Sequence, residues 1–133
     1  GVTLFGTFVA FCGATLIGTL ALIFLVIESL FFHPSSFILH PFLLHPFLLI
    51  PITAFAGLLG SLFDSFLGAT VQAIYYCDFD QKETESAMHR CGRATRLMRG
   101  WRWLDNAGVN FGASVVGSLV TVVAYAAIAG AAF

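Results

Sequence analysis

The sequence predicts an all-α, polytopic integral membrane protein: a helical bundle of about three transmembrane helices, with a proline-rich broken segment and one cytosolic loop. Hydrophobic residues make up 59% of the 133 residues and charged residues only 10%, whereas a soluble domain carries roughly 25% charged residues. All six Lys and Arg residues fall within residues 75–106, together with five of the seven acidic residues. We therefore expect a single membrane domain, which we interpret as a fragment of a longer protein.

The first span is expected at about residues 1–27, a stretch without a charged side chain. At a rise of about 1.5 Å per residue it is long enough to cross a hydrocarbon core about 30 Å thick. Small residues allow close helix packing in membranes. They recur along one side of this stretch, at Thr3, Thr7, Ala10, Ala14, Gly18 and Ala21.

Proline interrupts the next apolar stretch, residues 33–51, at Pro34, Pro41, Pro46 and Pro51. Proline lacks a backbone donor and clashes with the preceding helical turn. We therefore expect no regular helix here, but an extended or broken segment at the interface, or a re-entrant piece shielded by protein.

The second span, at about residues 52–74, carries a carboxylate, Asp64, in an otherwise apolar segment. An ionisable side chain at membrane depth costs about 2.5–3.5 kcal/mol on insertion scales, so its default interpretation is functional. Helical spacing places it on a stripe of small and polar residues. The stripe comprises Gly57, Gly60, Ser61, Asp64, Ser65, Gly68 and Gln72. Ordinary helix packing also produces small-residue stripes, which is the alternative interpretation.

Residues 75–106 form the hydrophilic loop, and the excess of Lys and Arg predicts that it lies in the cytosol. Its arginines recur every three residues from Arg90 to Arg102. They fit either a solvated surface beside anionic lipid headgroups or a phosphate-binding cluster. The net charge of −1 gives no indication of a nucleic-acid partner, and none is expected.

Four residues of this loop combine ligand types that suit zinc: Cys77, Asp80, His89 and Cys91. Thiolates and an imidazole bind zinc, and a carboxylate can complete a tetrahedron. Their spacing, C-x2-D-x8-H-x-C, is irregular. The alternative is a pair of cytosolic thiols that bind no metal.

The third span is expected at about residues 108–133. Asn106 and Asn110 lie one turn apart at its start, and we expect both to point into a shared cavity. Asp105 and Asn106 could also serve as helix caps.

Several motifs together resemble one family. They are G-S-x-x-D-S-x-x-G-A-T-x-Q at 60–72, Y-Y-C at 75–77, C-G at 91–92 and R-G-W-R-W-L-D-N-x-x-V-N at 99–110. With these the chain resembles the C-terminal half of the integral membrane family that contains transmembrane protein 19, also called domain of unknown function 92. One branch of the family, in plants and cyanobacteria, is phytyl-phosphate kinase, which adds a second phosphate to an isoprenoid monophosphate. The resemblance implies site residues at Asp64, Ser65, Gly68, Thr70, Gln72, Asp105, Asn106 and Asn110.

From this resemblance we expect a Mg²⁺-dependent isoprenoid-phosphate kinase with a nucleoside triphosphate as co-substrate. Asp64 and Asp105 would hold Mg²⁺, because this ion needs only one or two carboxylates beside substrate phosphates. Asn106, Asn110 and Gln72 would orient phosphate oxygens or metal-bound water. Ser65, Gly68 and Thr70 would lie at the phosphate or substrate, which Arg99 or Arg102 would clamp at the cytosolic surface.

The lipid bilayer is the expected partner of the apolar surfaces, and the remainder of the full-length chain is needed to complete the bundle. The fragment could therefore be inactive alone. The alternative function is non-enzymatic: part of a transporter or a scaffold, in which Asp64 is a proton or ion relay or ties two helices together.

Overall fold

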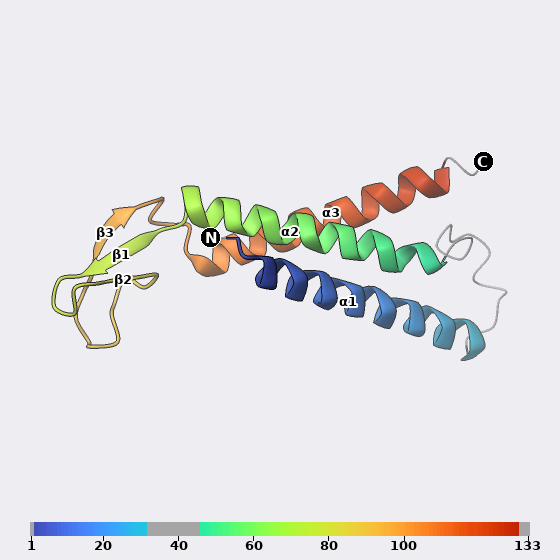
Figure 1. Ribbon diagram of the computed structural model, residues 1–133, viewed down its shortest axis with the longest axis horizontal. Coiled ribbons are helices and arrows are strands. Elements are labelled where there is room, and N and C mark those ends of the chain that lie inside the picture. Colours follow the sequence, from blue (N-terminus) through green and yellow to red (C-terminus); the bar gives the residue numbers. More distant parts are fainter. Residues whose placement is uncertain (1, 32–45, 131–133) are drawn as a thin grey trace. The chain divides into compact units, whose positions relative to one another are not determined.

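The computed structural model describes residues 2–31 and 46–130 (Figure 1). These residues form three long helices and a short 3-10 helix: α1 (Leu4–Phe31), the 3-10 helix Pro46–Leu48, α2 (Leu49–Thr70) and α3 (Asn106–Gly130). Within the described ranges, three stretches are long and apolar enough to cross a membrane: Leu4–Glu28, Leu49–Thr70 and Asn106–Ile128. The predicted class, a helical membrane protein with about three spans, is confirmed.

The ends of the helices differ from the expected spans. Helix α2 begins at Leu49 rather than at residue 52, because Pro51 falls in its first turn, where a backbone N–H has no partner inside the helix. The expectation of no regular helix was therefore wrong for residues 49–51. The same helix ends at Thr70 rather than at 74, where a strand begins. Most of the proline-rich segment, residues 32–45, lies outside the described residues.

The first and third helices are also shifted from the expected ranges. Helix α1 runs past residue 27 to Phe31, and α3 begins at Asn106 rather than at 108. Whether the whole chain forms one membrane domain stays a prediction.

The hydrophilic loop contains a small sheet that the all-α prediction missed. Three short strands, β1 (Ile74–Cys77), β2 (Lys82–Thr84) and β3 (Arg96–Arg99), pair antiparallel in the order β2-β1-β3. The aromatic and β-branched run at the start of β1 favours a strand. Central β1 pairs Tyr75 with Thr84 on one side and with Leu97 on the other. The strands are only three or four residues long, so periodicity gave little signal.

The chain divides into two compact parts: residues 62–114, and residues 2–61 together with the residues from 115 onward. In the second part, α1 and α2 pack through small residues. A side chain on Gly57 would meet the Cβ of Ala14, and one on Gly18 would meet Thr53. The predicted small-residue face of the first span therefore makes the expected close contact.

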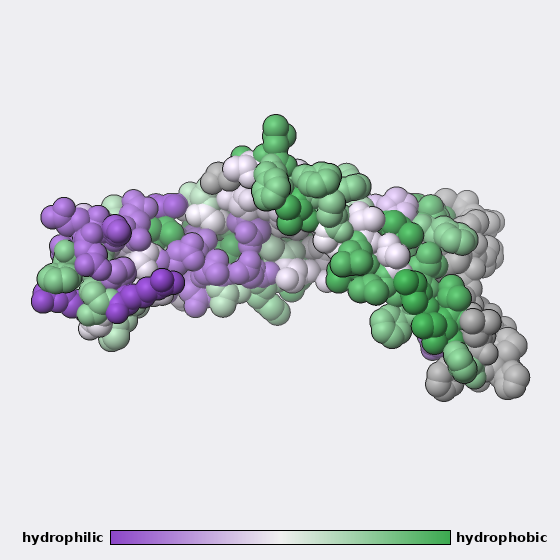
Figure 2. Space-filling model, turned by 60° about the horizontal axis from the view of Figure 1, so that its bottom comes forward, coloured by the Kyte–Doolittle hydropathy of each residue, from purple (hydrophilic) through white to green (hydrophobic). Residues whose placement is uncertain are grey.

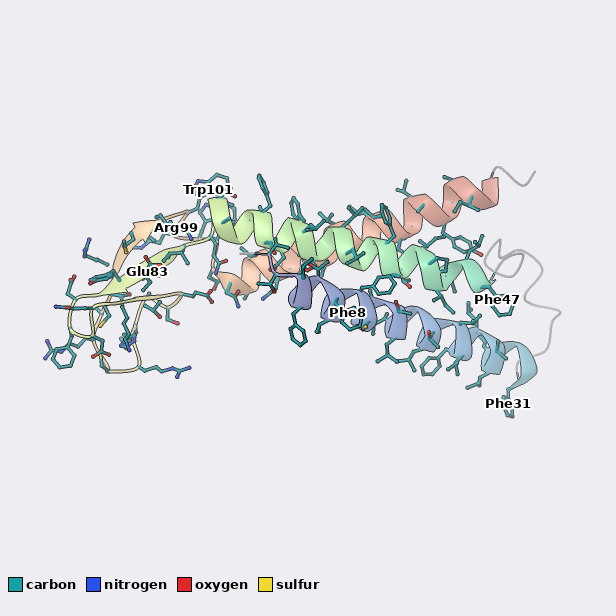
Figure 3. The ribbon with its side chains drawn as sticks, viewed as in Figure 1. Phe8, Phe31, Phe47, Glu83, Arg99 and Trp101 are labelled. Carbon is teal, nitrogen blue, oxygen red and sulfur yellow. The ribbon has the colours of Figure 1, made fainter. Side chains whose placement is uncertain are left out.

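Large apolar side chains on the helices point outward. Phe8, Phe31 and Phe47 are exposed and project away from the ribbon (Figure 3). In Figure 2, hydrophobic residues gather over the helices and hydrophilic residues over the sheet. Exposed apolar area on this scale marks a surface that is covered in the native setting, and helices of membrane-spanning length suggest lipid, or other helices of the full-length protein, as that cover.

Candidate functional site

The end of α2 and the start of α3 are tied together by backbone hydrogen bonds. The N–H of Trp101 donates to the carbonyl of Val71, and the N–H of Ala73 donates to the carbonyl of Leu104, both at 2.8 Å. The segment that leaves α2 therefore runs beside the segment that enters α3. One candidate span ends and the next begins here, so we expect this junction to lie at a membrane surface.

Gly100 makes the close approach at this junction. Its φ is +82°, and a Cβ added there would collide with the carbonyl of Gln72. Glycine accepts this left-handed conformation and leaves room for the neighbouring backbone. The glycine of the motif R-G-W at 99–101 is thus a structural requirement of the junction.

Two predicted phosphate-binding residues make contacts with the end of α2. Arg99 donates from Nη1 to the carbonyl oxygen of Ala69 at 2.7 Å, which places a cation at the negative end of the helix dipole. The Thr70 hydroxyl donates to the carbonyl of Phe66 at 2.7 Å. Arg102, the other predicted phosphate clamp, is exposed.

Asp105 caps α3. Its Oδ1 accepts the backbone N–H of Gly108 at 2.9 Å, which satisfies one of the donors at the helix start. The capping interpretation of Asp105 is therefore confirmed, and its role as a magnesium ligand stays a prediction.

The two asparagines of α3 do not point inward as expected. Asn106 and Asn110 are exposed, and the inward face of the first turns is formed instead by Val109, which is buried. Whether the two amides share a cavity in the full-length protein stays a prediction. The apolar valine, rather than the amides, is buried, because burying an amide without a partner costs free energy.

The polar stripe of α2 faces inward as predicted. Its seven residues, the last of which, Gln72, follows the end of α2, are all buried or partly buried. On the other side Leu62 and Phe66 are exposed, whereas Leu58, Leu59 and Phe63 are also partly buried. Ser65 and Gly68 belong to this partly buried face. Gly68 lies against the side-chain carbonyl of Gln72, where an added Cβ would lie 3.1 Å from Oε1.

Two polar atoms of this stripe stand out. Within the described part of the chain, Asp64 Oδ1 and Gln72 Nε2 are buried and have no hydrogen-bond partner. Asp64 lies six residues before the last residue of α2, which is about 9 Å along the axis at 1.5 Å per residue. A buried carboxylate oxygen without a partner at this depth requires an explanation.

Sequence reasoning missed the tryptophan pair of the junction. The rings of Trp101 and Trp103 stack with their centroids 5.3 Å apart, and both are exposed. Tryptophan is enriched where a membrane meets water, so the W-R-W spacing beside a span was an available signal.

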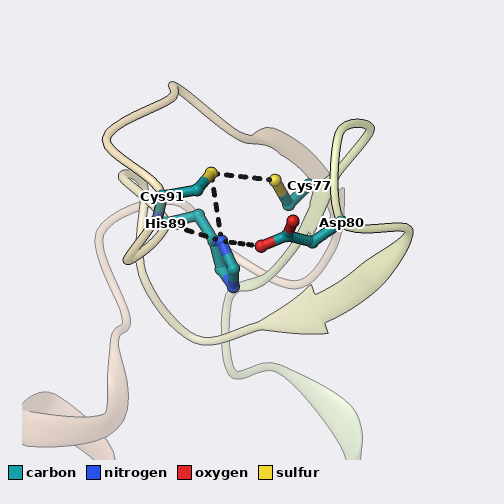
Figure 4. Close-up of side chains that lie close together, drawn as sticks. All are labelled: Cys77, Asp80, His89 and Cys91. Carbon is teal, nitrogen blue, oxygen red and sulfur yellow. Dashed lines mark hydrogen bonds and ion pairs between the residues drawn. The ribbon is translucent and has the colours of Figure 1, made fainter.

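The four predicted zinc ligands come together in the hydrophilic loop (Figure 4). The two sulfur atoms of Cys77 and Cys91 lie 3.7 Å apart. Nδ1 of His89 lies 3.2 Å from Cys91 Sγ and 2.9 Å from Oδ2 of Asp80. One ligand atom from each of the four residues lies within 4.8 Å of all the others, although their positions in the chain are irregularly spaced.

Comparison with known proteins agrees with these motifs. Residues 1–118 match the family described as integral membrane protein DUF92. The chain belongs to this family. This DUF92 chain is also 39% identical over 74 residues to Protein PGR of Arabidopsis thaliana. The match covers 56% of this chain and 24% of PGR, so the chain spans about a quarter of the length of this relative. No solved structure matches the chain significantly.

Proposed function

We propose that this DUF92 chain carries part of a membrane kinase site that transfers a phosphate from a nucleoside triphosphate to a prenyl monophosphate. The observation that carries the proposal is the buried, unpartnered Oδ1 of Asp64 in the second span. A carboxylate at this depth costs several kcal/mol. A native protein retains such a group where a bound ion, a proton or a reaction uses it.

The surroundings of the junction suit a substrate with an apolar tail and a charged head. Leu62 and Phe66 expose apolar side chains along α2, where a prenyl tail could lie in the bilayer. At the surface end, Arg102 and Trp103 are exposed. Tryptophan positions the interface, and a guanidinium binds phosphate through paired N–H groups.

The carboxylates of Asp64 and Asp105 are the expected holders of Mg²⁺, which prefers oxygen ligands. Both belong to the compact part formed by residues 62–114. The capping bond of Asp105 is compatible with this role, because a carboxylate offers about four acceptor positions. When bound, Mg²⁺ neutralises phosphate charge during transfer. Asn106 and Asn110 expose amides beside Asp105, where they could orient phosphate oxygens.

One observation favours a non-enzymatic alternative. Asp64 lies about 9 Å inside the end of α2, on a face of small residues, whereas Asp105 is exposed at the start of α3. A carboxylate at that depth suits a proton or ion relay of a transporter, or a tie to another helix of the full-length protein.

The test uses the full-length protein in lipid nanodiscs with a prenyl monophosphate, a radiolabelled nucleoside triphosphate and Mg²⁺. Asp64→Asn keeps the size of the side chain and removes the charge, so we expect the rate to fall at least about 100-fold, in the range of lost electrostatic catalysis. Asp105→Asn retains a capping oxygen, so a similar loss would report the charge rather than the cap. Phe55→Leu, on an exposed position of α2 that has no role in the proposed site, is the matched control.

Full activity of both aspartate variants would refute the assignment of the metal holders. If the unmutated protein phosphorylated no prenyl monophosphate under any Mg²⁺ or nucleotide condition, while Asp64→Asn abolished an ion flux, the transporter alternative would replace the kinase.

A further inference from the structure

We propose that Cys77, Asp80, His89 and Cys91 form a structural zinc site that holds the small sheet together. The site is separate from the proposed kinase function and involves none of its residues. It follows from the convergence of four ligand atoms, two sulfurs, one nitrogen and one oxygen, within 4.8 Å of one another (Figure 4).

The two separations that involve Cys91 Sγ are close to the edges of a tetrahedron around a zinc ion. Zinc lies about 2.3 Å from sulfur and about 2.0–2.1 Å from nitrogen, which gives tetrahedral edges of about 3.8 Å between two sulfurs and about 3.5 Å between sulfur and nitrogen. The Cys77–Cys91 sulfur separation is 3.7 Å, and the separation of Cys91 Sγ from His89 Nδ1 is 3.2 Å. A disulfide would require about 2.05 Å between the sulfurs, and the two cysteines are not bonded to each other.

Hydrogen bonds alone do not account for the cluster. His89 Nδ1 lies 2.9 Å from Oδ2 of Asp80, and a carboxylate requires a donor there. The same Nδ1 accepts the backbone N–H of Cys91 at 3.4 Å. One ring nitrogen cannot carry a proton and offer its lone pair at the same time. A cation resolves the conflict, because the imidazole lone pair, the carboxylate and both sulfurs can all point at it.

The local backbone places the ligands. Cys77 is the last residue of β1 and is buried, with 1% of its surface exposed. Asp80 lies in the turn to β2, where Gln81 has a positive φ of 50°. His89 and Cys91 lie in a tight turn closed by the Gly92 N–H, which donates to the His89 carbonyl at 2.9 Å.

A second contact supports the same arrangement. The guanidinium of Arg93 lies 4.3 Å from the ring centroid of Phe79, so the turn after β1 and the turn after Cys91 meet here as well.

Four protein ligands make a closed site, which is the pattern of structural rather than catalytic zinc. A bound zinc would stabilise the sheet, whose strands have only three or four residues. Short strands with little core are marginally stable without such support. The zinc would hold the end of β1 against the loop between β2 and β3. We therefore expect its loss to loosen this sheet while the helices remain folded.

The test uses the full-length protein purified in detergent with its metal content measured by mass spectrometry. We expect about one equivalent of zinc per chain in the unmutated protein. This zinc should be lost in Cys91→Ser and in His89→Asn. Asp80→Asn should also lower the zinc content. Two matched controls should retain the zinc: Cys12→Ser, which changes a cysteine of α1, and Asp78→Asn, which is compared with Asp80→Asn. Asp78 is the control because its carboxylate pairs with Arg96 at 3.1 Å rather than with the cluster.

Cysteine alkylation of the unmutated protein tests the site without any variant, and so does not depend on whether the variants fold. Cys77 and Cys91 should resist alkylation until a chelator is added, whereas labelling of Cys12 should not depend on the chelator. The proposal is overturned by equal zinc in Cys91→Ser and unmutated protein, by iron in place of zinc, by a Cys77–Cys91 disulfide in freshly purified protein, or by alkylation that is indifferent to chelator.

Discussion

Arg99 donates a hydrogen bond from Nη1 to the backbone carbonyl of Ala69 at 2.7 Å, and so joins the end of β3 to the last turn of α2. The carbonyls at the end of a helix lack partners within it and carry the negative end of the dipole. Both arginines are exposed, but only Arg99 of the two makes a hydrogen bond within the described part of the chain, so Arg99 stabilises the junction. The two arginines, equivalent candidates in the sequence, have different surroundings in the structure.

We predict that Arg99→Gln lowers the stability of the junction by about 1 kcal/mol, the typical value of such a bond near a helix end. Arg102→Gln should leave stability unchanged and should raise the KM for a prenyl phosphate if the proposed kinase function holds. Thermal unfolding of the full-length protein in detergent measures the first effect, and steady-state kinetics the second. Equal loss of stability in both variants would contradict this division of roles.

The second prediction compares two glycines with nearly the same φ. Gly92 and Gly100 have φ of +80° and +82°, but only Gly100 has a neighbour, the carbonyl of Gln72, where a Cβ would lie. Gly92→Ala should cost about 1–2 kcal/mol from the left-handed conformation alone. Gly100→Ala should cost more, because the backbone that joins α2 to α3 must also move. Unfolding midpoints of the two variants decide between these outcomes, and a smaller loss for Gly100→Ala would be inconsistent with the junction as described.

The third prediction concerns the packing of α1 on α2. A Cβ added to Gly18 would lie 3.0 Å from the Cα of Ile50, which is tighter than an ordinary contact. A Cβ added to Gly13 would have no neighbour within 4 Å. Gly18→Ala should therefore destabilise the protein by about 1–3 kcal/mol, the usual cost of overpacking. Gly13→Ala should be neutral or slightly stabilising, because alanine favours the helix by about 0.5–1 kcal/mol. The comparison fails if the two variants unfold at the same temperature.

The fourth prediction is the orientation in the membrane. Every Lys and Arg of the chain lies between residues 82 and 102, so the sheet should face the cytosol. A cysteine introduced at Lys82 should be labelled by an impermeant reagent only after sealed membranes are opened, and one at Ser35 without opening them. Mass spectrometry of the labelled peptides separates these positions from the natural cysteines. Labelling at Lys82 in intact, right-side-out membranes would reverse the orientation.

The sequence by itself determined the features that depend on neighbouring residues. Long apolar stretches gave the helical membrane class, and helical spacing gave the inward stripe around Asp64, because both follow from the local geometry of a helix. The capping role of Asp105 was also readable, since a cap acts within three residues of its own position.

Only the tertiary structure decided which distant residues meet. The sulfurs of Cys77 and Cys91 are fourteen residues apart in the chain and 3.7 Å apart in space, because β1, the turn after it and the tight turn at Gly92 bring them together. The same holds for Arg99 and Ala69, thirty residues apart. Strand pairing and turn geometry set these distances, and strands of three or four residues leave too short a pattern in the sequence to predict their register.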